Sequence, residues 1–186
     1  MRYAPCLVAI VAFSLAPLVP SASAEAISSA YTPLKLKLCK DVTLPEAREY
    51  GGVFECEGYG GTLVRVAEGD LRMFVSYGPN AADQTAAQET LPQFNTIGET
   101  LEWRLASGKP FATILRFRWD SDNGEGSTLV VTKLGKGDSC HVAYIVATGN
   151  PNANLLAREV ADSQARGFSC KRDRPRRYGP DGRQAD

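Results

Sequence analysis

The segment GDSCH, residues 137–141, places four reactive residue types side by side. Asp138, Ser139, Cys140 and His141 are the types from which hydrolases build a nucleophile, a base and the group that orients the base. Side chains can form such a set only where the backbone brings them together, so the element that carries this segment decides its chemistry.

The letters GDS also open the nucleophile block of the GDSL hydrolases, in which the serine begins a helix and a distant histidine completes the triad. Here the segment continues into the apolar stretch HVAYIVA, which predicts a strand, and His141 is the only histidine in the chain. Successive side chains of a strand point to opposite faces, so Ser139 and His141 share a face that Cys140 does not. Without a placed carboxylate this pair favours a strand end over a site, and we predict no catalytic residue here.

The chain lacks the residue patterns of metal and nucleotide sites. One histidine, and cysteines without C-x-x-C spacing, do not supply a zinc site. Asp120, Asp122 and Glu125 in DSDNGEG could gather a calcium ion, but the glycine is misplaced for an EF-hand, and a solvated hairpin tip is the preferred interpretation. GYGGTL has Leu63 where a dinucleotide fingerprint needs its last glycine. We therefore predict no metal and no cofactor.

Aromatic and acidic residues leave two further possibilities. Trp103 and Trp119 could stack against sugars or bases, but both occupy inward positions of alternating strands and are predicted to be core residues. The 21 acidic residues are compatible with a carboxylate pair that cleaves glycosidic bonds, whose position the sequence does not reveal.

The N-terminus predicts export. Arg2 precedes an apolar run over residues 7–15, and Ala22 and Ala24 fit the small-x-small pattern of a signal peptidase site. Cleavage after Ala24 would remove a signal peptide, residues 1–24, and leave 162 of the 186 residues. Because no later stretch is long and apolar enough for a membrane helix, we expect no transmembrane segment in the mature chain and a location in the periplasm or outside the cell.

We expect one β-rich globular domain, residues 25–170, followed by a basic tail, residues 171–186. The 21 basic and 21 acidic side chains of the chain balance, so no overall field favours nucleic acid. The tail is rich in arginine, proline and glycine and poor in apolar residues, which predicts disorder. Its arginines could contact anionic headgroups, although a solvated tail is the preferred interpretation.

Alternating apolar and polar residues predict the strands. TLEWRLA and FATILRFRW alternate in this way, and the short link SGKP makes them a hairpin. The same patterning and turn residues predict further strands over residues 31–42, 52–56, 62–67, 71–77, 127–134 and 139–147. About eight strands with short links predict a mainly antiparallel sheet or half-barrel.

Two segments break the alternation. The alanine-rich residues 79–92 predict a short helix. A longer helix is predicted over residues 151–166, because Pro151 suits a first helical position and Leu156 and Val160 lie one turn apart. The expected fold class is α+β, a mainly antiparallel sheet with a C-terminal helix packed on it.

The cysteines predict two disulfides. Cys6 would leave with the signal peptide, and an even set of thiols in an exported chain is typically paired. Of three possible connectivities, Cys39 with Cys56 and Cys140 with Cys170 closes the shortest loops, about 17 and 30 residues, which stabilise by about 3 and 3.5 kcal/mol on the chain-entropy model. GDSCH would then be an anchor point, with His141 dispensable for stability.

Several segments carry a resemblance: VAEGDLRMFVSYG, LPQFNTIGETLEWRL, PFATILRFRW, LVVTKL, CHVAYIVA and ANLLAREVAD. Over about residues 31–170 the chain resembles a recurring family of small exported proteins of Gram-negative bacteria to which no function is assigned. That resemblance implies no site residue. SGKPF, residues 107–111, is also similar to the SGxxY loop of small β-barrel inhibitors of C-type lysozyme, with Phe111 in place of the tyrosine.

Since the sequence offers neither a nucleophile motif nor a metal cluster, it favours a non-enzymatic binding or interaction protein of the periplasm. Its expected partner is an envelope component or another protein. Two alternatives stay open, a lysozyme inhibitor-like protein acting through SGKPF and an envelope hydrolase using a carboxylate pair.

Overall fold

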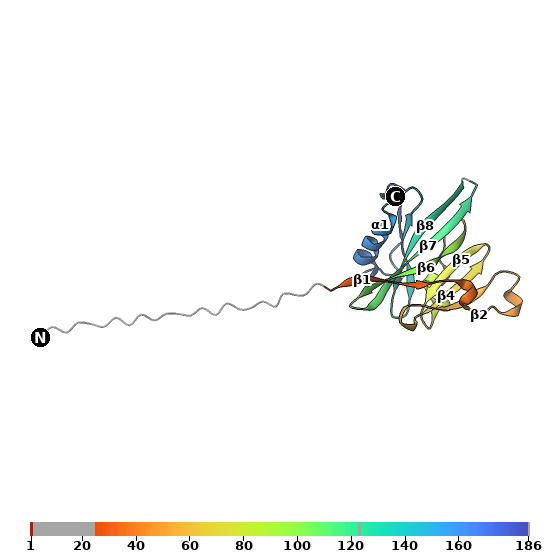
Figure 1. The fold of residues 1–186 in the computed structure, drawn as a ribbon, viewed down its shortest axis with the longest axis horizontal. Coiled ribbons are helices and arrows are strands. Elements are labelled where there is room, and N and C mark those ends of the chain that lie inside the picture. The colour runs from red at the N-terminus through yellow and green to blue at the C-terminus, as the bar shows by residue number, and fades with distance from the viewer. Residues whose placement is uncertain (2–24, 123, 186) are drawn as a thin grey trace.

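The computed structural model describes Met1, residues 25–122 and residues 124–185. Apart from Met1, the predicted signal peptide, residues 1–24, lies outside the described residues. The chain forms three layers (Figure 1), in which a seven-stranded sheet carries the helix α1 (Ala153–Val160) on one face and a four-stranded sheet on the other. Each face of the larger sheet therefore has its own hydrophobic core.

The larger sheet has the strand order β1-β6-β7-β8-β9-β10-β11. The bounds are β1 (Ile27–Pro33), β6 (Phe94–Ala106), β7 (Lys109–Ser121), β8 (Gly124–Leu134), β9 (Ser139–Val146), β10 (Arg176–Tyr178) and β11 (Gln184–Ala185). Neighbouring strands are antiparallel, except that β10 runs parallel to β9. The sheet is thus mixed, and its antiparallel pairs agree with the expected mainly antiparallel sheet, whereas the parallel pairing of β10 with β9 was not expected.

The smaller sheet is antiparallel throughout, with the order β2 (Lys40–Asp41), β3 (Val53–Glu57), β4 (Leu63–Gly69) and β5 (Arg72–Tyr77). The strand predicted over residues 31–42 is interrupted by a 3-10 turn, Leu36–Leu38, and contributes to both sheets. Further 3-10 turns lie at Pro45–Ala47 and Tyr59–Gly61. Alternation showed that each strand has a dry face, but it could not show that two sheets pack on each other.

The alanine-rich segment forms two 3-10 turns, Ala81–Asp83 and Thr85–Gln88, in place of the predicted helix. It lies along the open edge of β5, where the Gln84 side chain makes the hydrogen bonds that the backbone of a neighbouring strand would make. The Gln84 Oε1 atom accepts the Tyr77 N–H at 3.2 Å, and its Nε2 donates to the Tyr77 carbonyl. Backbone groups that would otherwise be unpaired at a sheet edge are satisfied in this way.

The predicted C-terminal helix is confirmed. α1 continues into a π-helical turn, Ala161–Ala165. The side chains that face the sheet are mostly small: Ala153, Ala157, Val160, Ala161 and Ala165 are all buried. Small side chains let the helix backbone lie close to the strands.

The core between the two sheets holds Trp103, which is fully buried as predicted. Its indole N–H donates to Thr32 Oγ1 at 2.8 Å, and the Tyr77 ring meets it edge-on at 5.9 Å. A buried indole N–H needs such a partner, which β1 supplies.

Two disulfides join Cys39 to Cys56 and Cys140 to Cys170, the pairing that closes the shortest loops. The first links the segment before β2 to β3. The second links β9 to the chain just beyond α1, so it holds the helix against the sheet. Disulfides of this kind are typical of proteins that fold in an oxidising compartment.

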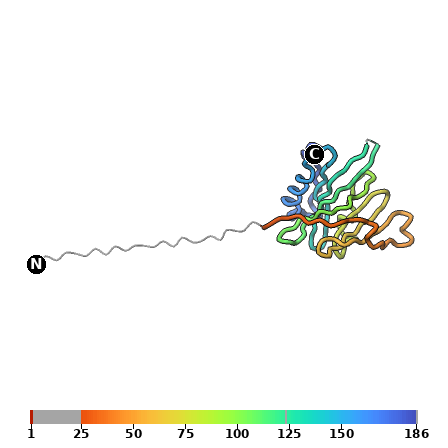
Figure 2. Tube along the Cα trace, viewed as in Figure 1, coloured from red at the N-terminus to blue at the C-terminus, as the bar shows by residue number. Residues whose placement is uncertain are grey.

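The C-terminal segment differs from the expectation. We predicted disorder over residues 171–186, yet the described residues 171–185 fold back onto the body of the molecule (blue in Figure 2). Tyr178 in β10 is only 9% exposed and belongs to the core beneath the helix. The prediction rested on the average composition of the tail, which gave no weight to Tyr178, its one aromatic residue. In addition, the disulfide of Cys170 holds the start of the segment close to β9.

Candidate functional site

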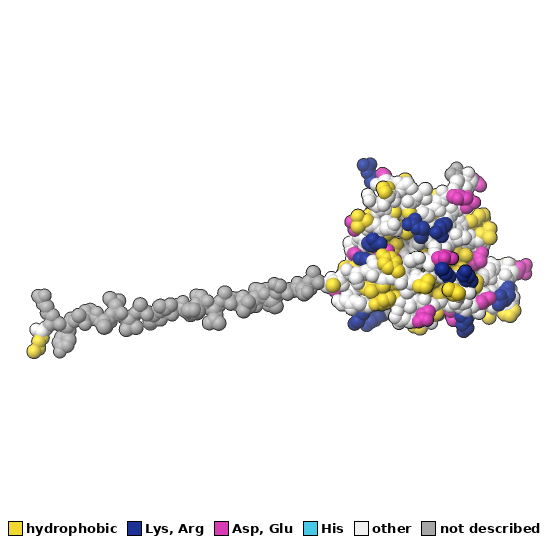
Figure 3. Space-filling model, in the orientation of Figure 1, with side chains coloured by type: hydrophobic (Ala, Val, Ile, Leu, Met, Phe, Trp, Pro, Cys, Tyr) yellow, Lys and Arg dark blue, Asp and Glu magenta, His cyan; other side chains and the backbone are white. Residues whose placement is uncertain are grey.

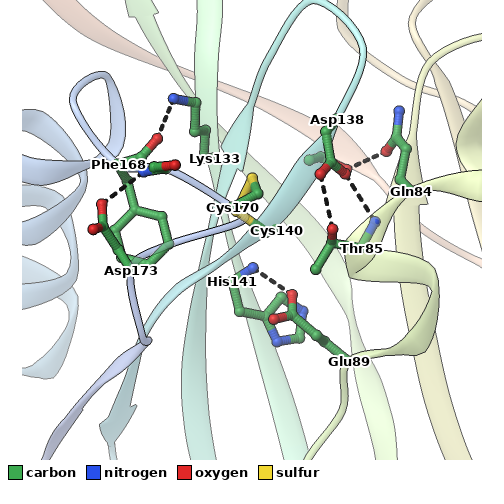
Figure 4. Close-up of a disulfide and its surroundings, with 12 residues drawn as sticks. Gln84, Thr85, Glu89, Lys133, Asp138, Cys140, His141, Phe168, Cys170 and Asp173 are labelled. Atoms are coloured by element: carbon green, nitrogen blue, oxygen red, sulfur yellow. Dashed lines mark hydrogen bonds between the residues drawn. A yellow bond between two sulfur atoms is a disulfide. The ribbon is translucent and has the colours of Figure 1, made fainter.

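Figure 4 shows that the residues of GDSCH point to separate structural partners. Both Asp138 carboxylate oxygens accept hydrogen bonds from Thr85, one from its N–H and one from its hydroxyl, each at 2.8 Å. Ser139 is 1% exposed, and its hydroxyl bonds to the Gln84 side chain. These contacts pin the start of β9 to the two 3-10 turns.

His141 is also a core residue, at 1% exposed. Its Nδ1 atom lies 2.9 Å from the Tyr144 hydroxyl, and its backbone N–H donates to Glu89 Oε2 at 2.6 Å. Burial lowers the pKa of His141 to about 3, so the ring is neutral at physiological pH. The expectation that His141 is dispensable for stability is at odds with this packing, because removing a buried ring leaves a cavity.

Within the described ranges, no three His, Cys, Asp or Glu side chains are grouped in a way that could hold a metal ion. Asp120, Asp122 and Glu125, the residues weighed for calcium, form no such group. Across the same ranges, no helix has the length and apolar character needed to cross a bilayer.

The segment SGKPF forms the turn of the β6–β7 hairpin. Ser107 and Gly108 have φ values of +49° and +78°, and both are exposed with Lys109 at the tip. Phe111 stands where the similar inhibitor loop has tyrosine, but it is 8% exposed, with the Arg166 guanidinium 5.3 Å from its ring. The loop therefore presents Ser107, Gly108 and Lys109 and keeps its aromatic residue in the core.

A hollow of about 600 Å³ opens between the β4–β5 turn and the far end of the β7–β8 hairpin. We call it the Trp119 groove. Its lining comes from five strands, β4 to β8, and one turn: Glu68, Leu71, Met73, Phe94, Asn95, Thr96, Arg118, Trp119, Asp120, Glu125, Gly126 and Ser127. Its size falls in the range typical of small-molecule sites.

The Trp119 indole is fixed in place. Trp119 pairs with Gly126 across the hairpin, and a Cβ atom at residue 126 would lie 2.2 Å from the indole Cζ2. Only glycine lets the ring lie this close to the β8 backbone. The indole N–H donates to Thr128 Oγ1 at 3.0 Å, which orients the ring in its plane. The groove thus has a preorganised aromatic wall.

Exposed apolar side chains surround this wall. Leu71 is 60% exposed and Phe94 is 50% exposed, although both are large hydrophobic residues. The Arg72 guanidinium stacks over the Phe94 ring at 5.4 Å, and Arg72 Nε donates to the Pro92 carbonyl at 3.0 Å. Apolar residues gathered in one hollow mark a binding surface more often than scattered ones do.

The rim of the groove is acidic. Three carboxylates, Glu68, Asp120 and Glu125, line it with one guanidinium, Arg118. Asp120 lies directly opposite Glu125 in the hairpin register, and among the described residues none of the three carboxylates has a cationic partner within 4.0 Å. Like charges opposite each other disfavour the hairpin, and a bound cation would remove that cost.

Sequence reasoning missed this groove because it assigned Trp119 to the core. Trp119 does face the inner side of the larger sheet, but it is only partly buried, since the hairpin carries it past the smaller sheet. A signal was present in Gly126, two residues from the NG turn, as a glycine inside a strand marks a close approach. Comparison with protein-family models, with curated proteins and with solved structures found no match to this chain.

Proposed function

We propose that this chain is a non-enzymatic binding protein of the periplasm or the extracellular space, and that the Trp119 groove takes an amphipathic ligand with a positive charge. The single observation that carries the proposal is the composition of the groove, in which a fixed indole and exposed apolar side chains lie beside three carboxylates and one guanidinium. The two disulfides support the oxidising compartment.

The two halves of this ligand follow from the two parts of the groove. Its apolar part would cover Leu71, Phe94 and the Trp119 face, since removing apolar surface from water contributes about 25 cal/mol per Å². Its cationic group would lie at the acidic rim, beside Glu68 and the edge of the hairpin that carries Asp120 and Glu125. An ammonium near an indole also gains a cation–π attraction.

A matched pair of probes tests the proposal. We expect octyltrimethylammonium, below its micelle concentration, to bind about tenfold more tightly than octanoate, because the probes share a chain length and differ in charge. Fluorescence titration reports the site, since Trp103 is fully buried and Trp119 is the only other tryptophan.

Variants make this test specific. Glu125→Gln should weaken the cationic probe and leave octanoate binding unchanged or stronger. Trp119→Phe should remove most of the fluorescence response, while Glu57→Gln, an exposed carboxylate on β3, is the matched charge control. Equal binding of both probes, or an equal effect of Glu125→Gln and Glu57→Gln, would contradict the proposal.

The opposed carboxylates also favour a second candidate, an envelope hydrolase that uses Asp120 and Glu125 as its acid and its nucleophile or base. That function predicts release of reducing ends from peptidoglycan by the purified chain. Asp120→Asn and Glu125→Gln should each abolish the release, whereas Trp119→Phe should only weaken substrate binding. Binding of the cationic probe without any such release favours the first candidate.

A further inference from the structure

The opposite side of β7 carries two arginines that have no acidic partner among the described residues. Arg116 and Arg118 are two residues apart in the strand, so both side chains lie on the face that carries α1. In Figure 3 basic side chains gather over β7 and β8 beside α1. Arg116 Nη1 donates to Ser127 Oγ at 2.9 Å and Nη2 to Asn154 Oδ1 at 3.4 Å, both neutral acceptors. Arg118 makes no hydrogen bond or ion pair within the described part of the chain.

Other arginines on this face are neutralised. The Arg104 guanidinium forms a two-pronged contact with the Asp162 carboxylate at 2.8 and 2.6 Å. Arg158 Nε donates to Glu102 Oε1 at 2.7 Å. A carboxylate thus neutralises Arg104 and Arg158, whereas the described part of the chain supplies none for Arg116 and Arg118.

A hollow of about 330 Å³ adjoins the two arginines, and we call it the arginine hollow. Its lining also includes Gly98, Thr100, Asn154 and Arg158. The hollow forms where β6 loses register with β7 between Ile97 and Leu101, an irregularity of the kind that often lies beside binding sites.

The two carboxylates that line the arginine hollow are already engaged. Glu102 accepts from Ser29 Oγ at 2.5 Å as well as from Arg158. Glu99 lies 3.7 Å from the Lys35 ammonium. Two positive charges therefore face the hollow without a counter-ion from the described chain, and both burial and the neighbouring Arg118 lower the pKa of Arg116. An anion would relieve that repulsion.

We propose that Arg116 and Arg118 bind a phosphate group in the arginine hollow. The guanidinium fork matches the spacing of phosphate oxygens, and a dianionic phosphate balances the two charges. Asn154 Nδ2 and the Thr100 hydroxyl offer further donors in the same hollow. Arg118 lines both hollows and Arg116 lines only this one, so Arg116→Gln tests the phosphate site without changing a residue of the Trp119 groove.

The test is a titration of the intact mature protein with inorganic phosphate, at an ionic strength held constant with sodium chloride. Arginine Nε–Hε signals in ¹H–¹⁵N spectra report the contact directly. We expect saturable shifts of the Arg116 and Arg118 signals. Arg116→Gln and Arg118→Gln should each lower the affinity for phosphate by about tenfold. Arg174→Gln, an exposed arginine of the C-terminal segment, is the matched control and should bind phosphate normally.

A second arm separates free phosphate from a lipid headgroup. Flotation with phosphatidylcholine vesicles, with or without phosphatidic acid, shows whether the hollow also accepts a membrane phosphate. Binding in either arm that is lost in both Arg116→Gln and Arg118→Gln supports the proposal. The Arg118 variant should fold, because Arg118 has no partner to lose among the described residues. Absence of binding in both arms, or an equal loss in Arg174→Gln, would overturn it.

Discussion

His141 gives the stability of this protein a specific dependence on pH. Its pKa in the folded state is about 3, against 6.5 for the free side chain, because burial disfavours the charged ring. Below pH 6.5 His141 therefore becomes protonated in the unfolded chain but stays neutral in the folded chain. Stability is fully present above that pH and should fall by roughly 1 kcal/mol per pH unit as the pH drops toward 3.

Urea unfolding of the wild type and of His141→Gln between pH 7 and pH 4 checks this expectation. Glutamine can still bond to the Tyr144 hydroxyl but does not titrate, so the variant should lose the steeper part of the pH dependence. The pKa of the nearby Glu89 is raised by burial, which favours folding at low pH, and both proteins share that contribution. Parallel pH profiles would show that His141 is not the responsible group.

The ion pairs beneath α1 show what alternation cannot reveal at a single residue. In TLEWRLA the polar positions include Glu102 and Arg104, and the pattern distinguishes a dry face from a polar one. The structure buries this polar face too, leaving Glu102 and Arg104 each 7% exposed under the helix. Their partners come from α1 and the π-helical turn, more than fifty residues later in the chain. No local pattern encodes such a pairing.

At the scale of elements, local signals predicted where the strands and the helix lie along the chain better than they predicted which elements lie side by side. The β6–β7 and β7–β8 hairpins and the C-terminal helix follow from turn residues and periodicity, which act over a few positions. Division into two sheets, and the parallel pairing of β10 with β9, depend on contacts between distant segments. The Trp119 groove and the arginine hollow each gather residues from elements distant in the sequence, so local signals could not predict them either.

The C-terminal segment offers a test at the same scale. Ending the chain after Cys170 keeps the second disulfide but removes β10 and β11, including the buried Tyr178 ring. We expect this truncation to lower the free energy of unfolding by about 2 kcal/mol, the contribution of burying one large side chain. Tyr178→Ala in the full chain should reproduce most of the loss. An unchanged thermal midpoint in the truncated chain would mean that this segment does not stabilise the fold.

For the molecule as a whole, the larger sheet couples the two cores. In β7, Ile114 faces the core under the helix, while Leu115 and Phe117 face the core between the sheets. Unfolding of β7 would expose residues of both cores at once. We therefore expect the domain to unfold in a single transition with its disulfides intact.

Two probes placed in the two cores can decide this. In Trp119→Phe, fluorescence comes from Trp103 alone and reports the core between the sheets, whereas the methyl NMR signals of Ala157 and Val160 report the core under the helix. Their urea midpoints should coincide, because both cores depend on the same seven strands. If the helix signals vanish at a lower urea concentration while Trp103 fluorescence stays native, the helix layer is a separate unit, held to the sheet mainly by the Cys140–Cys170 bridge.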